Sequence, residues 1–286
     1  MSERIEDFLG SPTAREMLEN VGRYLRVQCG VITPTNKVGP GDVEMTAIHA
    51  ALTYMDNFVQ DVIALKLTEI APSIRLILEE KTQVRKLSLL EPYCGSVLID
   101  PIDGTAEFVA GGKDFSILIC LLKDGQPKTS VGYYPFGDHI LDNGKCADDL
   151  PETKILACHY RINHGEDGGW GGHLRRQGYE TQCNGQGFAT NLTAALMVID
   201  GRADALVFPY TAAHDAIAPA HIVAQYGGVA RRYALGPKWS SSTRQPFTFA
   251  DVEQDHNRDE GSSRVRVIAA RSNGCLDEIE SILGTA

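Results

Sequence analysis

An apolar strand that runs directly into two aspartates constrains this chain more than any other feature. Residues Val97–Ile99 are apolar, and the string D-P-I-D-G-T follows at positions 100–105. Two carboxylates on a turn stiffened by proline can share hard cations, which prefer carboxylate oxygens. Glycine lets the backbone approach a ligand closely, and the N–H groups of Gly104 and Thr105 can hold a phosphate oxygen. The string therefore predicts a site for cations and a phosphate.

The charge of the chain supports this interpretation. Its 286 residues carry a formal net charge of −10, and no long run of lysine and arginine occurs. An acidic surface is a poor match for nucleic acid, which binds clustered basic residues. An acidic protein with an anionic substrate needs cations to mediate binding. We therefore expect metal ions, a small-molecule phosphate ester as substrate and no nucleic-acid partner.

Helical and strand patterns alternate along the chain, and 43% of the residues are hydrophobic. Such alternation predicts a layered α/β fold. We expect helices at 2–28, 43–67, 189–200, 215–226 and 274–283, strands at 74–78, 97–100, 115–122, 129–135, 154–158, 203–208, 228–234 and 264–270, and loops at 33–42, 164–173 and 236–263.

A polar stretch at 137–150 separates two halves of the chain. We expect an N-terminal half over 1–145 that carries most of the metal ligands. The C-terminal half, 146–286, would carry the last metal ligand and the substrate specificity.

Cysteine usage and hydropathy indicate a cytoplasmic protein. The seven cysteines are odd in number and scattered, which suits free thiols in a reducing compartment. The first residues lack the apolar segment of a secretory signal, and no window is apolar enough to span a membrane. We therefore expect a cytoplasmic protein without a membrane partner.

The string at 100–105, with Leu98-Ile99 before it, resembles the signature of the inositol monophosphatase superfamily. The flanking Glu107-Phe108 is most similar to the branch that includes 3'(2'),5'-bisphosphate nucleotidases. The resemblance implies alternating layers of helix and sheet, as in fructose-1,6-bisphosphatase. It also implies two or three Mg²⁺ ions, inhibition by lithium and a homodimer.

The acidic partners of that signature can be sought at their family spacing. Glu79-Glu80 lies about twenty residues upstream, preceded by Leu78 where the family usually has glycine. Thr53-x-x-Asp56 matches a family motif at a helix start. The family's W-D-x-A-A-G corresponds to residues 214–219, in which Asp215 is kept while His214 and Pro219 replace the tryptophan and the last glycine.

The resemblance also implies a role for each residue. Glu79, Asp100 and the carbonyl of Ile102 would hold one ion, and Asp100, Asp103 and Asp215 would hold a second. Glu80 would lie behind the ligands or hold a third ion. Thr105, polarised by Asp56, would orient the attacking water, and the catalytic group would thus comprise Asp56, Thr105 and Glu79. Gly104 and Thr105 would bind the phosphate.

Substrate choice is less constrained by the sequence. Phe208 stands seven positions before Asp215, where inositol-type enzymes carry an acidic residue that holds sugar hydroxyls. An aromatic side chain there would pack on a flat base, or would equally well be a core residue. Ala189 and Thr190 match the family's substrate-binding helix start. We expect 3'-phosphoadenosine 5'-phosphate or a related nucleotide.

Other interpretations remain open at this point. Inositol, histidinol and sugar phosphates, as in a fructose-bisphosphatase-like enzyme, require the same chemistry. A non-catalytic regulatory or binding relative would be expected to have lost ligands, and none of the six key side chains is missing: Asp56, Glu79, Asp100, Asp103, Thr105 and Asp215.

Overall fold

The computed structural model describes most of the chain. The described residues are 2–31, 35–36, 51–52, 54–80, 82–84, 92–137, 139–140, 155–158, 170–182, 188–235, 243–255 and 263–284.

The described strands form two main sheets and one small pair. The first main sheet has the order β3-β4-β5-β6-β7 and the second β12-β11-β13-β10-β8-β9. The strands are β1 (Thr35–Asn36), β2 (Ala51–Leu52), β3 (Arg75–Leu78), β4 (Ser96–Asp103), β5 (Ser116–Lys123), β6 (Gln126–Tyr134), β7 (His139–Ile140), β8 (Ile155–Cys158), β9 (Glu180–Gln182), β10 (Ala205–Ala212), β11 (Val229–Tyr233), β12 (Arg244–Gln245) and β13 (Arg264–Ala270).

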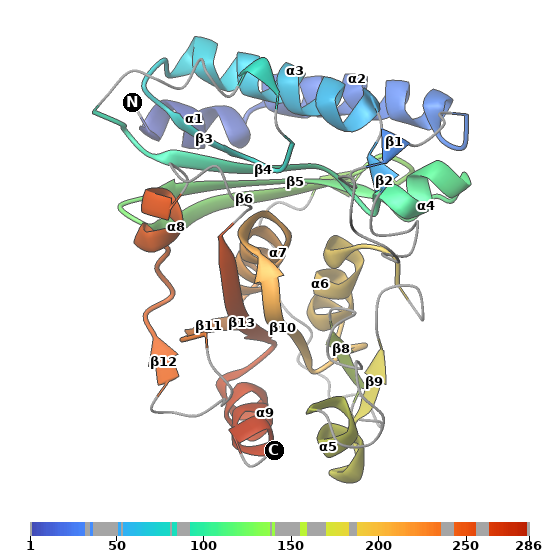
Figure 1. Ribbon diagram of the computed structural model, residues 1–286, viewed down its shortest axis with the longest axis vertical. Helices are drawn as coiled ribbons and strands as arrows, with labels where there is room; N and C mark the ends of the chain where they lie inside the picture. Colours follow the sequence, from blue (N-terminus) through green and yellow to red (C-terminus); the bar gives the residue numbers. More distant parts are fainter. Residues whose placement is uncertain are drawn as a thin grey trace.

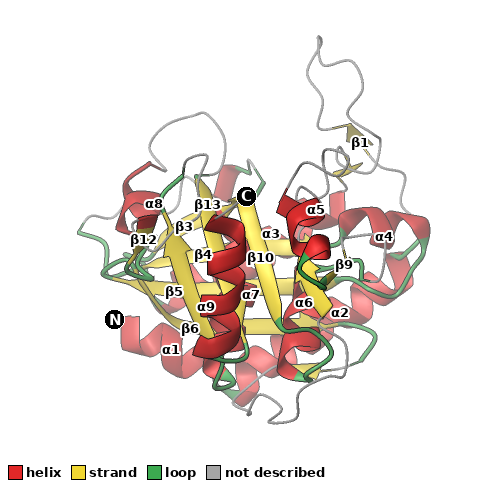
Figure 2. Cartoon of the chain, turned by 90° about the horizontal axis from the view of Figure 1, so that it is seen from below, coloured by secondary structure: helices red, strands yellow, loops and turns green. Residues whose placement is uncertain are grey.

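Helices lie above, between and below the two main sheets (Figures 1 and 2). α1, α2 and α3 cover the outer face of the first sheet, α6 and α7 fill the layer between the sheets, and α5 and α9 cover the far face of the second (Figure 1). The described helices are α1 (Ser2–Leu9), α2 (Pro12–Gln28), α3 (Tyr54–Ile70), α4 (Thr105–Ala110), α5 (Trp170–Arg176), α6 (Asn191–Ile199), α7 (Ala213–Gln225), α8 (Ala250–Asp255) and α9 (Asn273–Gly284). The layers follow the order helix, sheet, helix, sheet, helix.

Alternating side chains explain why both sheets are covered on both faces. Along β4, Val97 and Ile99 pack into the cluster with α1–α3, whereas Leu98 packs into the cluster with α6 and α7. In β10, Leu206 faces the middle layer, and Val207 joins the cluster with α5 and α9. Strands buried on both faces read as continuous apolar runs, which the sequence shows.

The helix predicted at 2–28 is two helices, α1 and α2. Ser11 separates them, and its side chain accepts a hydrogen bond from the Ala14 N–H at 3.2 Å. Pro12 occupies the first turn of α2, where its missing N–H is not needed. The Ser-Pro pair is a local start signal that the continuous apolar periodicity concealed.

Three other elements differ from prediction. The predicted loop at 236–263 contains β12 and α8. Phe249 and Val252 are buried there, and the Arg232–Asp251 ion pair ties α8 to the second sheet. The polar composition of the stretch hid these anchors. Within the predicted loop at 164–173, α5 begins at Trp170. Of the helix predicted at 43–67, residues 43–50 lie outside the described residues, Ala51–Leu52 form β2, and α3 begins at Tyr54.

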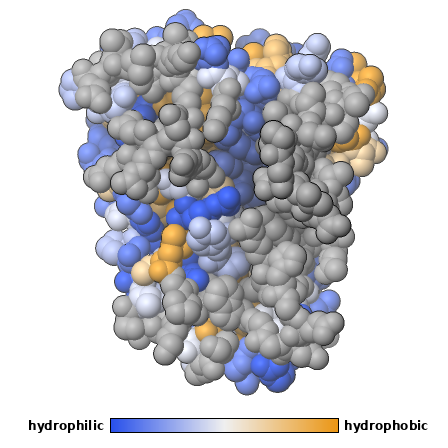
Figure 3. Space-filling view, in the orientation of Figure 1, coloured by the Kyte–Doolittle hydropathy of each residue, from blue (hydrophilic) through white to orange (hydrophobic). Residues whose placement is uncertain are grey.

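The predicted boundary between residues 145 and 146 lies outside the described residues, as does most of the predicted loop at 33–42. Within the described ranges, no helix has both the length and the apolar character needed to cross a membrane. Among the residues coloured by hydropathy in Figure 3, most are hydrophilic, and the hydrophobic ones lie in small separate areas.

The contact between α2 and β6 should tolerate no added methyl group. A Cβ at Gly22 would lie 2.4 Å from Cε1 of Tyr133, a side chain with no exposed surface. We expect Gly22→Ala to lower the free energy of unfolding by about 1–3 kcal/mol, measured by urea denaturation. Gly10→Ala is the matched control, since its Cβ would meet only backbone oxygens at 3.7 and 3.9 Å. Equal stability of the two variants would contradict this packing.

Candidate functional site

The end of β4 carries a β-bulge that turns both aspartates of the D-P-I-D-G-T string toward the middle layer. Asp100 lies opposite Leu118 of β5, and Asp103 lies opposite Ser116. Three steps along β4 thus match two steps along β5, and Pro101, which has no N–H, falls within the bulge. In a regular strand, side chains three residues apart would point to opposite faces. Because of the extra residue, both carboxylates face α6 and α7.

Asp103 binds the start of α6. Its Oδ1 accepts hydrogen bonds from the backbone N–H of Asn191 at 3.1 Å and from the Asn191 side-chain amide at 3.0 Å. Its Oδ2 accepts from the Leu192 N–H at 3.0 Å and from the Ser116 hydroxyl at 2.9 Å. A carboxylate at a helix N-terminus satisfies amides that have no partner within the helix. Asp103 therefore connects the first sheet to the middle layer.

Burial is the main influence on the acidity of both aspartates. It raises the pKa of Asp103 to about 7, although the hydrogen bonds from Asn191 and Leu192 lower it. Burial raises the pKa of Asp100 well above its ordinary value, and the charges of Glu79, Asp103 and Asp215 raise it further. A hydrogen bond between Glu79 and Asp100 acts in the same direction. These four acidic residues, Glu79, Asp100, Asp103 and Asp215, are called the acidic group below.

Asp215 enters the acidic group from the first turn of α7. Its side chain is 26% exposed, and its Oδ1 lies 3.4 Å from Nε2 of the buried His214. About one turn further on, Pro219 lies inside α7. Proline cannot donate the helical hydrogen bond that the Asp215 carbonyl would otherwise receive. Two of the departures from the family motif, His214 and Pro219, thus change the surroundings of Asp215.

Thr105 begins α4, and its hydroxyl points back toward the bulge. The Thr105 Oγ1 lies 3.2 Å from Oδ1 of Asp56 and 2.9 Å from the carbonyl oxygen of Ile102, so it can donate to either. Asp56 comes from the first turn of α3 and has no exposed surface. The predicted pair of Thr105 and Asp56 is therefore in direct contact, beside the carbonyl that was predicted as a metal ligand.

Gln60, which the sequence analysis did not single out, fixes the turn after β3. Its side-chain amide donates to the Glu80 carbonyl at 2.9 Å and accepts from the Glu80 N–H at 2.9 Å. Glu80 itself is buried, and Leu78 before it packs in the cluster with α1–α3. The sequence signal that could have identified Gln60 was its position one turn after Asp56 on the same helix. These two hydrogen bonds fix the backbone of Glu80 and thereby the position of the neighbouring Glu79, which hydrogen-bonds to Asp100.

Gly104, the N-cap of α4, lies close to Thr190, the N-cap of α6. Its φ of +93° is in the left-handed region that favours glycine. A Cβ there would lie 2.8 Å from Cγ2 of Thr190 and 3.1 Å from the carbonyl oxygen of Asp114. The glycine of the string is therefore required both by its backbone conformation and by this close contact.

The three predicted substrate residues separate into two cases. Thr190 is the N-cap of α6, accepting from the Thr193 N–H at 2.9 Å, and the preceding Ala189 donates its N–H to Oδ2 of Asp114 at 2.6 Å. Phe208 has no exposed surface and packs in the core between the two sheets, opposite Val267 of β13. Of the two roles that the sequence left open for Phe208, this burial favours the core residue over the substrate contact.

The acidic group fits magnesium in chemistry. Its donors are all oxygens, which Mg²⁺ prefers. Oδ1 of Asp100 is buried and has no hydrogen-bond partner among the described residues, so a cation would satisfy it. In the described part of the chain, no three His, Cys, Asp or Glu side chains converge closely enough to enclose an ion as they stand. Both oxygens of Asp103 accept hydrogen bonds from α6 and Ser116, so a cation bound by Asp103 would have to replace some of these partners.

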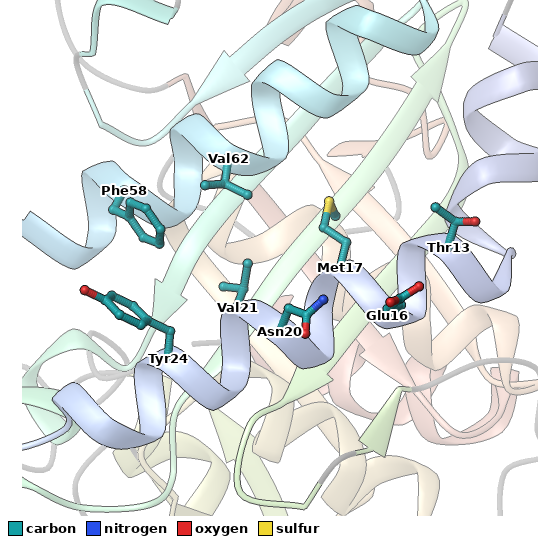
Figure 4. A pocket seen from close by; sticks show the side chains of 8 residues that line it. All are labelled: Thr13, Glu16, Met17, Asn20, Val21, Tyr24, Phe58 and Val62. Atoms are coloured by element: carbon teal, nitrogen blue, oxygen red, sulfur yellow. The ribbon is translucent and has the colours of Figure 1, made fainter.

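A pocket elsewhere on the surface does not belong to this site. It has a volume of about 520 Å³ and lies between α2 and α3 (Figure 4). Eight residues line it: Thr13, Glu16, Met17, Asn20, Val21, Tyr24, Phe58 and Val62. Glu16 supplies the only carboxylate among these eight residues, which is too little to bind a cation.

Comparison with known proteins supports one family. A model described as the Inositol monophosphatase family matches residues 14–253. A curated protein similar to part of the chain is the 3'(2'),5'-bisphosphate nucleotidase CysQ of Aggregatibacter actinomycetemcomitans, with 34% identity over 93 residues. That match covers 32% of this chain and 34% of the relative, so the chain matches about a third of the length of that protein.

Solved structures show the same fold at low sequence identity. An IMPase of Thermotoga maritima has a TM-score of 0.65 and 19% identity, covering 95% of each chain. An IMPase/NADP phosphatase, solved with Mg²⁺ and phosphate, has a TM-score of 0.67 and 14% identity, covering 100% of this chain and 97% of the other. These likenesses confirm the predicted layered α/β fold.

The acidic group should cost stability when no cation is present. Because the pKa of Asp100 is raised above its unfolded value, the folded protein keeps a proton that the unfolded chain releases, and stability falls as pH rises above about 4. We expect Asp100→Asn to stabilise the metal-free protein at pH 8 by an amount on the order of 1 kcal/mol. The variant should also lose stabilisation by Mg²⁺.

Urea denaturation in EDTA and in Mg²⁺, between pH 5 and pH 8, measures both effects with buffers of about equal ionic strength. Asp124→Asn, at the exposed turn after β5, is the control for removing one carboxylate. A metal-free Asp100→Asn protein that is less stable than the wild type at pH 8 would contradict the assignment.

Proposed function

Because the chain belongs to the inositol monophosphatase family, we propose that it is a magnesium-dependent phosphatase, a phosphoric monoester hydrolase acting on a small phosphate ester. The observation that carries the proposal is the burial of Asp100, 3% exposed, among the charges of three other acidic residues. Such an arrangement in a protein of net charge −10 is unfavourable until cations bind.

In this proposal the residues of the acidic group bind two ions. Glu79, Asp100 and the Ile102 carbonyl hold one ion, and Asp100, Asp103 and Asp215 hold the other. Glu80, buried behind Glu79, supports the ligands or holds a third ion. When bound, such ions lower the pKa of a coordinated water and neutralise charge on the departing oxygen.

The chain's own residues orient the reactants. Asp56 accepts the Thr105 hydroxyl proton in a hydrogen bond, which leaves the lone pairs of Oγ1 free to accept from a water. Asp56 has no exposed surface, and its position in the first turn of α3 keeps the pair fixed. The backbone N–H groups of Gly104 and Thr105 hold a phosphate oxygen, and Ala189 and Thr190 contact the rest of the substrate.

We propose 3'-phosphoadenosine 5'-phosphate or a related nucleotide as the substrate. Support comes from the nucleotidase relative over a third of its length and from Glu107-Phe108 beside the signature. The burial of Phe208 removes the argument for base stacking at that position. Inositol, histidinol and sugar phosphates are the alternative substrates.

A non-catalytic relative is the alternative from another class. The contact between Thr105 and Asp56 argues against it, because a binding protein has no need to orient a water molecule. The cytoplasmic location, lithium inhibition and the homodimer stay predictions.

The first test is phosphate release in Mg²⁺ from a panel of 3'-phosphoadenosine 5'-phosphate, inositol 1-phosphate, histidinol phosphate and fructose 1,6-bisphosphate. We expect the nucleotide to give the highest kcat/KM, and EDTA to abolish release. A preferred substrate other than the nucleotide would keep the phosphatase and overturn the nucleotide assignment. Absence of release from all four, together with absence of Mg²⁺ binding by calorimetry, would favour the non-catalytic alternative.

The Thr105 hydroxyl provides a sharper test of mechanism. We expect Thr105→Val, which keeps the shape but removes the hydroxyl, to lower kcat about 100-fold or more. Thr105→Ser should retain most of the activity, because its hydroxyl can still donate to Asp56. If kcat of Thr105→Val stayed within about threefold of the wild type, the proposed orientation of water would be wrong.

A further inference from the structure

A second aspartate, Asp114, also binds the start of α6, through other residues than Asp103 does. It follows α4 and precedes β5, and the side chain is half-buried. Its Oδ2 accepts a hydrogen bond from the Ala189 N–H at 2.6 Å, and its Oδ1 accepts one from the Thr193 hydroxyl. The sequence analysis did not single out Asp114, since nothing local to it indicates a partner 75 residues away.

Asp103 and Asp114 together bind the first turn of α6. Asp103 accepts from the N–H groups of Asn191 and Leu192, whereas Asp114 binds the residue before the N-cap and the residue in the third helical position. The N-cap hydroxyl, on Thr190, takes the N–H of Thr193. Each carboxylate therefore reaches amides or hydroxyls that the other does not.

Further contacts fix the side chain of Thr193. Its Oγ1 lies 2.5 Å from the hydroxyl of Tyr134 at the end of β6, and it accepts from the Thr190 hydroxyl at 3.0 Å. Asp114, Thr193 and Tyr134 thus connect α6 to the first sheet through β5 and β6, independently of Asp103 (Figure 1). Charged acceptors make the stronger hydrogen bonds in such a network.

The hydrogen bonds that Asp103 and Asp114 make to α6 differ in whether they can persist when a cation binds. Asp103 belongs to the acidic group, and holding a cation would turn it away from Asn191 and Leu192. Asp114 is outside the acidic group, and neither of its two contacts involves a residue of that group. When Asp103 turns to a cation, the position of the turn at 189–193 depends on Asp114.

We propose that Asp114 is a positioning residue, which keeps the first turn of α6 in place over the site while Asp103 exchanges the helix for a cation. The inference rests on the proposed function, because it takes the acidic group to bind Mg²⁺. It adds that Ala189 and Thr190 stay aligned for a substrate through Asp114, and that the Asn191 and Leu192 amides become available only after the exchange.

Amide hydrogen exchange tests the proposal without any turnover. In the wild-type protein, Mg²⁺ should speed exchange at Asn191 and Leu192 and leave Ala189 protected. In Asp114→Asn, whose amide offers one acceptor in place of two and no charge, Ala189 should exchange about tenfold faster in EDTA and in Mg²⁺. Asp124→Asn, at the other end of β5, should leave Ala189 unchanged.

A second pair of variants keeps the test independent of Asp114 itself. Thr193→Val removes the hydroxyl that donates to Asp114 and keeps the shape, whereas Thr193→Ser keeps the hydroxyl. We expect Thr193→Val to speed exchange at Ala189 and Thr193→Ser to restore the protection. With the preferred substrate, Asp114→Asn and Thr193→Val should raise KM about tenfold and change kcat less than about threefold.

The outcomes separate the two proposals. Loss of protection at Ala189 together with Asn191 and Leu192 when Mg²⁺ is added to the wild type would overturn the role of Asp114. Unchanged exchange at Ala189 in Asp114→Asn would do the same, whatever the activity. Absence of phosphatase activity in a wild-type protein that shows the expected exchange pattern would overturn the proposed function and support the positioning role.

Discussion

The hydrogen bonds between Asp103 and the first turn of α6 connect the parts of this structure that the site requires. They join a strand end of the first sheet to a helix in the middle layer, 88 and 89 residues further along the chain. A carboxylate at a helix N-terminus satisfies amides that have no partner within the helix, so the contact stabilises both elements. The same carboxylate is a proposed metal ligand. In the metal-free protein this side chain stabilises the start of α6. In the proposed metal site it would bind a cation, which would replace some of its hydrogen bonds to α6.

Much of the architecture follows from local patterns in the sequence. The strand predicted at 264–270 coincides with β13, and the helix predicted at 274–283 differs from α9 by one residue at each end. Long apolar runs and 3.6-residue periodicity depend on neighbours in sequence, which is why they could be recognised. The string at 100–105 indicated two carboxylates at a strand end, and its resemblance to a known signature supplied their partners. The contact between Thr105 and Asp56 is consistent with that resemblance.

The remaining features depend on contacts between distant segments, which a single sequence does not reveal. The sequence left Phe208 open between substrate contact and core, and what favours the core is its buried position opposite Val267, far along the chain. Asp114 and Gln60 look like ordinary polar residues, and their importance comes from the helix and the turn that they reach. The division of the first helix at Ser11 was a different kind of miss, because the Ser-Pro start signal was local and the apolar periodicity outweighed it.

The bulge at Pro101 and Ile102 has a consequence for how this segment can vary. It makes the common direction of Asp100 and Asp103 a matter of how many residues separate them, more than of which residues these are. Loss or gain of a single residue between them would reverse the face of one aspartate and leave the apolar pattern of β4 untouched. The segment can therefore accept a change of side chain more readily than a change of length, because the number of residues between the two aspartates decides whether both face the site.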